Sequence, residues 1–490
     1  MESLEHKNQY TGHVIKQYEI DRYLRNGKDF IDDSAIEETL RKNSSPDRLE
    51  ILDIIDKSLS LQRLELNETA ALLNITDPEL WNMVFDAAGD IKNRVYGPRV
   101  VTFAPLYCGN YCVNSCLYCG FRKENNDIQR EILSDDNILR ETEALVKTGH
   151  KRLVVAFGEH PKSNIDYICN CLKLIYSVKI GHGEIRRVNV NAAPMSIADL
   201  HRLHDVGIGT FQVFQETYHH DTYRFVHPGG IKANYQWRLY ALHRALDAGV
   251  DDVGIGALFG LYDWKFDVMG LVAHTIDLEQ TFDGIGPHTI SFPRLEPASN
   301  APLANNPNPY KVSDADLFKA IAVARLSVPY TGMIITARES ADVRLGALSI
   351  GCTQTDASSR IGIAAYQNQT SEQQTNRQQF MLRDTRSLEV IVRELANMGY
   401  LTSFCTAGYR CGRTGKCFMN LAKHGKVHEY CIPNAMLTMK EYLIDFASPA
   451  TRVVGEQVIE RHLKNLDHSM ADIVIKRLKE IENGARDVRF

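Results

Sequence analysis

Short apolar runs alternate with amphipathic helical stretches through the middle of this chain, and this alternation restricts the fold more than any other feature. Strands that alternate with helices over roughly 250 residues favour parallel βα units in a number that suits a closed barrel. We therefore predict an α/β fold built around a TIM-type (β/α)8 barrel. The expected strands lie at 100–103, 152–156, 188–190, 209–214, 252–256, 288–291 and 333–335.

The segments on either side of the barrel are expected to be mainly helical. Ser45-Pro46-Asp47 and Thr76-Asp77-Pro78 are helix-start signals, and each precedes apolar residues at helical spacing. The polar stretch 367–379 is interpreted as a linker or surface segment. We predict three regions: a helical N-terminal extension (1–95), the barrel (96–386) and a mainly helical C-terminal domain (387–490).

Composition excludes several classes of protein. The chain has 490 residues with 56 basic and 61 acidic side chains, and a net charge of −5 does not suit a basic nucleic-acid-binding surface. No apolar run approaches the length of a membrane span, about 20 residues. The N-terminal residues show no basic segment followed by an apolar one, so we expect no signal peptide and a cytoplasmic protein.

Eleven cysteines are too sparse for a disulfide scaffold, and they fall largely into two groups. In the first group, Cys112, Cys116 and Cys119 stand as C-x-x-x-C-x-x-C directly after a predicted strand. Three thiolates can bind three irons of a 4Fe–4S cluster and leave the fourth iron open, which S-adenosylmethionine (SAM) can chelate in radical SAM enzymes. The alternative is a zinc loop with Cys108 as its fourth ligand.

Polar residues and glycines at successive strands agree with SAM binding. Glu159 can accept a hydrogen bond from the amino group of SAM, and the glycine before it allows a close backbone approach. Glu216 follows a later strand and offers a polar contact to the ribose. The residues expected to bind the cofactor are Gly158, Glu159, Arg187, Asn189, Glu216, Gly254 and Gly256.

Four long strings, 209–219, 251–263, 286–291 and 328–335, resemble the HydG family, and the resemblance extends from about residue 20 to 465. HydG enzymes are radical SAM tyrosine lyases that mature FeFe-hydrogenases, and they are related to 2-iminoacetate synthase. The resemblance implies a 5′-deoxyadenosyl radical that cleaves tyrosine to p-cresol and dehydroglycine. It also implies CO and cyanide formation at a second Fe–S cluster, where His288 helps to hold a labile iron. Arg338 and Ser340 persist from a family string and are expected to be catalytic.

The second cysteine group departs from the family pattern. Cys405 and Cys431 match two cluster ligands, but Gly408 stands where the middle cysteine belongs. Cys411 or Cys417 could replace that ligand, so a second cluster held by Cys405, Cys431 and Cys411 is one interpretation. In the others, a non-cysteine group or nothing takes the third position, or the thiols are merely packed.

The barrel departs from the family as well, because Glu296 replaces an arginine and Asp356 replaces a serine. An unpaired buried carboxylate near an amino-acid substrate would cost several kcal/mol (about 3–5). The alternative function is therefore a paralogue with another small substrate, in which Glu296→Arg should gain tyrosine turnover. A non-catalytic Fe–S scaffold is the second alternative. Expected partners are tyrosine or a related amino acid, ferredoxin or flavodoxin as electron donor, and metallocofactor maturation proteins.

Overall fold

The computed structural model describes residues 13–367, 373 and 375–490. Its main sheet has nine strands, and all but β11 form a closed parallel barrel because β10 pairs with β1 as well as with β9. The predicted TIM-type barrel is thereby confirmed. The barrel strands are β1 (Arg99–Gly109), β2 (Arg152–Phe157), β5 (Arg187–Asn191), β6 (Thr210–Gln212), β7 (Asp252–Gly256), β8 (Thr289–Ser291), β9 (Gly332–Ile335) and β10 (Gln354–Asp356).

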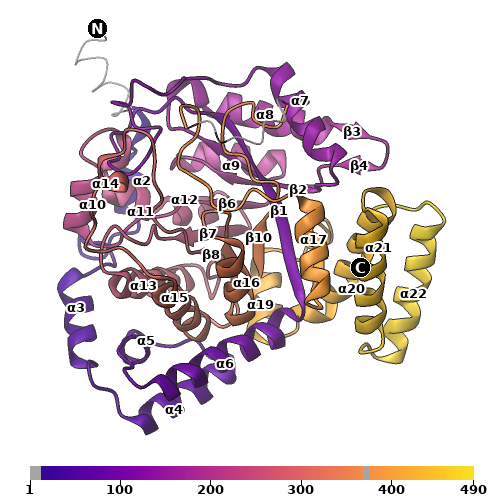
Figure 1. Ribbon diagram of the computed structural model, residues 1–490. Helices are drawn as coiled ribbons and strands as arrows, with labels where there is room; N and C mark the ends of the chain where they lie inside the picture. Colours follow the sequence, from indigo (N-terminus) through magenta and orange to yellow (C-terminus); the bar gives the residue numbers. More distant parts are fainter. Residues whose placement is uncertain (1–12, 368–372, 374) are drawn as a thin grey trace.

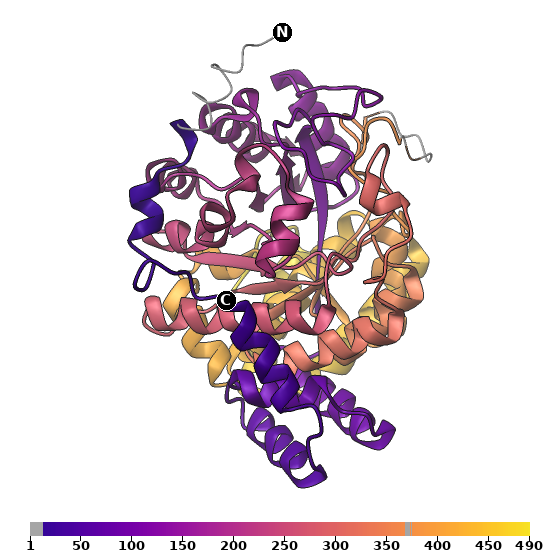
Figure 2. The ribbon, with the colours of Figure 1, turned by 90° about the vertical axis from the view of Figure 1, so that its left-hand side faces the viewer.

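Helices surround the barrel (Figures 1 and 2). The larger ones are α7 (Asp135–Lys147), α8 (Ile165–Ser177), α9 (Ile197–Val206), α12 (Ala241–Asp247), α13 (Trp264–Thr281), α15 (Asp314–Ser327) and α16 (Ala341–Ile350). Shorter elements are α10 (His220–Val226), α11 (Tyr235–Leu239), α14 (Pro302–Asn305), η1 (Pro161–Ser163), η2 (Ile231–Ala233) and the hairpin of β3 (Lys179–Ile180) and β4 (Gly183–Glu184).

The described part of the N-terminal region is helical, as predicted. Asp47 accepts a hydrogen bond from the Glu50 amide at the start of α4, and Asp77 accepts one from the Glu79 amide at the start of α6. Helix α6 packs against α15 and α16 (Figure 1). The helices are α2 (Gln17–Asp21), α3 (Asp33–Lys42), α4 (Arg48–Leu59), α5 (Leu66–Leu73) and α6 (Pro78–Tyr96).

The C-terminal region joins the barrel through β11 (Leu401–Ser403), whose residues pair with Arg99–Val101 at the start of β1. This register places the segment after β11 at the amino ends of the barrel strands. Helices α20, α21 and α22 pack together beside α17 (Figure 1). The helices are α17 (Leu388–Asn397), α18 (Ala407–Arg410), α19 (Gly415–Lys423), α20 (Val427–Asp445), α21 (Pro449–Leu463) and α22 (His468–Glu482).

Within the described residues, every helix is too short or too polar to cross a membrane. The N-terminal residues on which the absence of a signal peptide was predicted lie outside the described part of the chain. Part of the polar stretch 367–379 also lies outside it.

Candidate active site and second cysteine cavity

A cavity of about 230 Å³ lies at the carboxyl ends of the barrel strands; we call it the upper cavity. The loop after β1 brings all three thiols of the first cysteine group to its wall. Cys116 and Cys119 are buried and Cys112 is partly exposed. Active sites of (β/α)8 barrels lie at this end, which agrees with the predicted position of the cluster loop.

Burial, reinforced by neighbouring thiols, raises the pKa of Cys112 to about 11 and that of Cys116 to about 12. The thiols therefore stay protonated at neutral pH unless a cation stabilises the thiolates. Hydrogen bonds already orient two of the sulfurs, from Asn114 Nδ2 to Cys112 Sγ (3.6 Å) and from Gln379 Nε2 to Cys119 Sγ (3.3 Å).

The geometry of the three thiols fits an Fe–S cluster better than zinc. Four thiolates around one zinc ion must lie about 3.8 Å apart. Among the described residues, these sulfurs do not form a set within 4.8 Å of one another. Cys108, the fourth ligand of the zinc interpretation, is buried in β1 and absent from the cavity lining. Three spread thiols without a fourth suit a 4Fe–4S cluster with one open iron.

Gly158 and Glu159, two of the residues expected to bind the cofactor, line the upper cavity. A Cβ atom at Gly158 would collide with the Tyr111 carbonyl oxygen, so glycine allows the loop after β2 to lie against the cluster loop. Glu159 Oε2 accepts a hydrogen bond from Asn114 Nδ2 (2.5 Å). Its Oε1 is buried and has no hydrogen-bond partner within the described chain, so it is available to an amino group of a ligand.

Glu216 also lines the cavity, but it already has two protein partners. Its Oε1 lies 2.6 Å from Lys232 Nζ and 3.0 Å from Arg238 Nη2. Burial opposes ionisation of Glu216, yet the two cations outweigh burial and lower its pKa. Neither cation was predicted from the sequence, although both are basic residues close to Glu216 along the chain.

Four predicted cofactor residues do not line the upper cavity. Arg187 begins β5 and therefore lies at the opposite end of the barrel. Asn189 is buried inside the barrel, where its Oδ1 accepts a hydrogen bond from the Thr210 amide (3.0 Å). Gly254 and Gly256 contact the cavity only indirectly; a Cβ atom at Gly256 would lie 2.7 Å from the ring of Phe214, which does line it.

Of the two expected catalytic residues, Arg338 lines the upper cavity and Ser340 does not. Ser340 precedes α16 as its N-cap residue. The Arg338 guanidinium stacks over the Phe380 ring at 3.2 Å from its centroid. One of its five N–H donors reaches the Arg294 carbonyl (3.1 Å) in the described part of the chain. The remaining donors are available to an anionic ligand.

The end of the stretch interpreted as a linker forms part of the cavity wall. Gln379 and Phe380 line the cavity, and the Gln379 carbonyl accepts a hydrogen bond from the Gly120 amide (2.9 Å). Tyr107 Oη donates to Gln379 Oε1 (3.0 Å). The role of Gln379 was not predicted from the sequence because its segment is polar and has neither helical nor strand periodicity.

The Glu296 carboxylate is paired with an arginine, although burial still raises the pKa of its carboxyl group. Glu296 is buried, but its Oε1 lies 2.8 Å from Arg383 Nη2, and it does not line the upper cavity. The expectation of an unpaired carboxylate is therefore wrong at this position. Asp356 does line the cavity, and it lies 3.4 Å from Arg344 Nη2.

A smaller cavity of about 50 Å³, the lower cavity, lies at the amino ends of the strands. Cys405, Cys431 and His288 all line it, so the structure brings together three of the four residues proposed for the second metal site. The lining also contains three guanidinium groups, those of Arg99, Arg187 and Arg413.

The positive charge in the lower cavity acts on the thiol of Cys405. Arg187 Nη1 lies 3.4 Å from Cys405 Sγ and donates to its carbonyl (3.0 Å). Burial would raise the pKa of Cys405, but Arg187, Arg99 and Arg152 outweigh burial and lower it. Burial raises the pKa of Cys431. One of the two thiols is thus prepared to act as a thiolate ligand.

Cys411, the predicted third ligand, lies elsewhere. It is exposed, it lines a separate surface groove, and its Sγ is 3.3 Å from the Phe490 carbonyl oxygen. Cys417 is exposed on α19 and is also absent from the lining of the lower cavity. Gly408 does line this cavity, and the described residues supply no third thiol there.

His288 precedes β8 and contacts the Phe418 ring, with centroids 4.3 Å apart. Its Nδ1 lies 3.3 Å from Asp252 Oδ1 without the alignment of a hydrogen bond. Tyr409 Oη donates to the second oxygen of the same aspartate. Burial lowers the pKa of His288, so its imidazole is neutral and able to ligate a metal.

Two segments match known families: residues 106–268 match the Radical SAM superfamily, and residues 291–401 match the Biotin and Thiamin Synthesis associated domain. The crystal structure of a HydG, a maturase of the [FeFe]-hydrogenase, is 45% identical to this chain with a TM-score of 0.90. The match covers 94% of this chain and all (100%) of that one. The chain belongs to the HydG family.

HydG from Carboxydothermus hydrogenoformans is 36% identical with a TM-score of 0.78, over 95% of this chain and 99% of that one. The 2-iminoacetate synthase of Salmonella typhimurium is 28% identical over 348 residues, which cover 70% of this chain and 88% of the relative. As a HydG family member, the chain is a radical SAM lyase with a 4Fe–4S cluster and SAM as cofactors.

Proposed function

We propose that this HydG family member cleaves the Cα–Cβ bond of tyrosine to p-cresol and dehydroglycine in the upper cavity. The observation that carries the proposal is that one cavity combines the three thiols, the available donors of Arg338 and aromatic walls. The aromatic side chains in its lining are Phe103, Tyr107, Tyr118, Phe121, Phe157, Phe214, Phe292 and Phe380.

Cys112, Cys116 and Cys119 would hold three irons of the 4Fe–4S cluster, and Glu159 would accept a hydrogen bond from the amino group of SAM. When bound, these cofactors supply a 5′-deoxyadenosyl radical that can remove a hydrogen atom from a substrate. The raised pKa values of Cys112 and Cys116 support this role, because the positive charge of iron would stabilise their thiolates.

Arg338 is the group best placed to bind the tyrosine carboxylate. An arginine fork can bind a carboxylate through two parallel hydrogen bonds. The Phe380 ring beneath Arg338 fixes the guanidinium plane. Asp356 is held away from this role because its Oδ1 accepts a hydrogen bond from the Ala337 amide (2.8 Å) and its Oδ2 accepts one from Ser359 (2.5 Å).

Anaerobic incubation of the reconstituted enzyme with SAM, dithionite and tyrosine tests this function. We expect 5′-deoxyadenosine and p-cresol to form together. Deoxyadenosine without p-cresol would refute tyrosine as the substrate, and phenylalanine in place of tyrosine is the matched control for recognition of the phenol.

For the lower cavity, we propose a second Fe–S cluster bound by Cys405 and Cys431, with His288 near a labile iron and CO and cyanide as products for metallocofactor assembly. The three arginines support it because they offset the negative charge of a thiolate-bound cluster. Gly408 favours the alternative of tyrosine cleavage without CO and cyanide. Iron analysis and EPR of a Cys112/Cys116/Cys119 triple alanine variant separate the two: complete loss of iron rejects the second cluster.

The oxygen sensitivity of an open cluster suits a reducing cytoplasm, which we propose as the location of the protein. Ferredoxin or flavodoxin is the proposed electron donor, and metallocofactor maturation proteins are the proposed partners downstream.

A further inference from the structure

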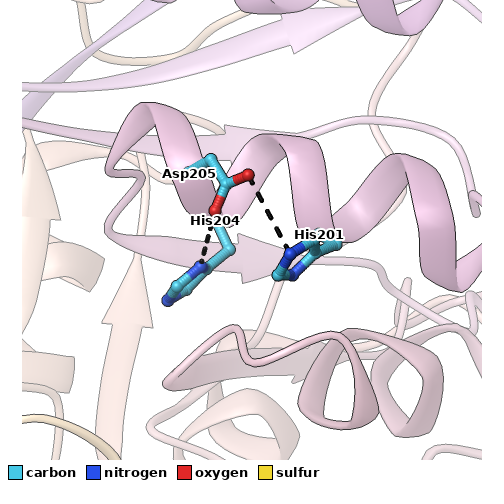
Figure 3. Close-up of side chains that lie close together, drawn as sticks. All are labelled: His201, His204 and Asp205. Atoms are coloured by element: carbon cyan, nitrogen blue, oxygen red, sulfur yellow. Dashed lines mark hydrogen bonds and ion pairs between the residues drawn. The ribbon is translucent and has the colours of Figure 1, made fainter.

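Three metal-ligating side chains gather on the outer face of α9, away from both cavities (Figure 3). His201, His204 and Asp205 each present one ligand atom, and these atoms all lie within 4.8 Å of one another. The side chains are between 44% and 63% exposed, so a metal ion can reach them from solvent.

The carboxylate of Asp205 lies between the two imidazoles (Figure 3). One oxygen is 3.4 Å from His204 Nδ1, and the other is 4.0 Å from His201 Nε2. Ligands bound about 2.1 Å from a tetrahedral metal lie about 3.4 Å from one another. The distance from Asp205 to His204 Nδ1 already has that value, and small side-chain rotations would shorten the other distances among the three ligand atoms to it.

A backbone contact outside the group orients His201. Its Nδ1 lies 3.1 Å from the Ala248 carbonyl oxygen, which can only accept a hydrogen bond. Nδ1 must therefore carry the proton, and the lone pair falls on Nε2, the atom that faces Asp205. Imidazoles that bind metals almost always donate their other N–H in this way. A surface ion pair of histidine and aspartate does not require this arrangement.

We propose that His201, His204 and Asp205 form a binding site for a divalent first-row transition metal ion, separate from the Fe–S sites. Two imidazoles and one carboxylate suit zinc, cobalt or ferrous iron, and solvent would fill the remaining positions. Through His201 and the Ala248 carbonyl, the ion would fix the end of α9 against the segment that leads into β7.

This site lies close in sequence to residues that contact Tyr409 in the wall of the lower cavity. The chain continues from α9 into Thr210, whose Oγ1 lies 3.3 Å from Tyr409 Oη, and from Ala248 into Asp252, which accepts from the same phenol. A metal ion on α9 would thus stiffen two segments that reach the lower cavity. The proposal does not depend on which reaction the upper cavity performs.

Titration of the reconstituted enzyme with Co²⁺ tests the site, with the visible absorption of bound cobalt as the readout. We expect one equivalent of Co²⁺ to bind with nitrogen and oxygen coordination and without thiolate charge transfer. Asp205→Asn should weaken that binding at least about tenfold, and His201→Ala/His204→Ala should abolish it. Co²⁺ should raise the thermal unfolding temperature of the wild type and not that of the double variant.

His424→Ala is the matched control. His424 is exposed and its Nδ1 faces the Asn420 carbonyl (2.7 Å), but the metal-ligand group on α9 does not include it. Its replacement should leave the titration unchanged. The same cobalt stoichiometry and affinity in the wild type and the double variant would overturn the proposal, as would a thiolate charge-transfer band for the bound ion. Equal thermal unfolding of the reconstituted proteins before cobalt is added shows that the variants fold.

Discussion

Replacement of Arg338 tests whether the upper cavity binds an amino-acid carboxylate. Arg338→Met preserves most of the length of the side chain and its contact with the Phe380 ring, but removes the charge and all five donors. Hydrogen bonds to charged groups contribute about 1.5–3 kcal/mol. At about 1.4 kcal/mol per tenfold change, the KM for tyrosine should rise about 12- to 140-fold.

Arg338→Lys is the matched control for this experiment. Lysine keeps the positive charge but lacks the planar fork that can bind both carboxylate oxygens. We therefore expect a KM between those of the wild type and Arg338→Met. Burial lowers the pKa of Arg338 itself, so a lysine at this site would be less securely charged than on a surface.

The assay measures p-cresol and 5′-deoxyadenosine over a range of tyrosine concentrations under anaerobic reducing conditions. At low tyrosine, the ratio of p-cresol to deoxyadenosine should fall in Arg338→Met. An unchanged KM would refute the carboxylate role. If p-cresol and 5′-deoxyadenosine instead fall in equal proportion at saturating tyrosine, Arg338 acts on SAM cleavage and not on tyrosine binding.

Further substitutions test the third ligand position of the lower cavity, the ion pairs of Glu216 in the upper cavity, and the buried ion pair of Glu296 outside both cavities. In the triple alanine background that lacks the first cluster, Gly408→Cys should retain more iron than its parent, while Gly408→Ala should not; equal iron in all three would contradict a third ligand position at 408. Glu216→Gln should lower the free energy of unfolding by about 3–5 kcal/mol, because it leaves Lys232 and Arg238 without their carboxylate partner. A decrease of less than about 1 kcal/mol in denaturant unfolding would contradict this. Glu296→Arg should destabilise the protein without any gain in p-cresol, because the new arginine would face Arg383. Adding Arg383→Glu to this variant should restore stability. Increased tyrosine turnover in Glu296→Arg alone would count against this reasoning.

The sequence predicted the barrel and the cluster loop because the signals for both are local. The three cysteines of the first group lie within one loop, so their spacing alone brings the thiols to one site. Glu159 and Glu216 come shortly after predicted strands, and parallel strands gather such residues at one end of a barrel. These predictions needed no knowledge of contacts between distant segments.

The predictions that failed concern which end of a strand a residue occupies, and a strand made of polar residues. The strand that holds Arg187 was predicted correctly, but Arg187 begins β5 and Asn191, which ends it, is the residue that lines the upper cavity. Strand β10 was missed because Gln354-Thr355-Asp356 has no apolar run. Its Gln354 instead accepts a hydrogen bond from Arg152 (3.0 Å) inside the barrel. Hydrophobic periodicity does not detect a strand whose inward side chains are polar.

The position of Cys411 shows why sequence proximity is a poor guide to a displaced ligand. Residues 407–410 form one helical turn, after which the Cys411 thiol faces the Phe490 carbonyl. Turning that thiol toward Cys405 would require the turn to unwind and would pull Arg410 from its ion pair with Asp487. A Cβ atom at position 408, in contrast, would meet only the Arg413 carbonyl at 3.4 Å and that residue's Cβ at 4.0 Å, both ordinary contacts. The lower cavity therefore keeps space for a third thiol at 408, and a local substitution there restores a ligand at far smaller structural cost than any movement of Cys411.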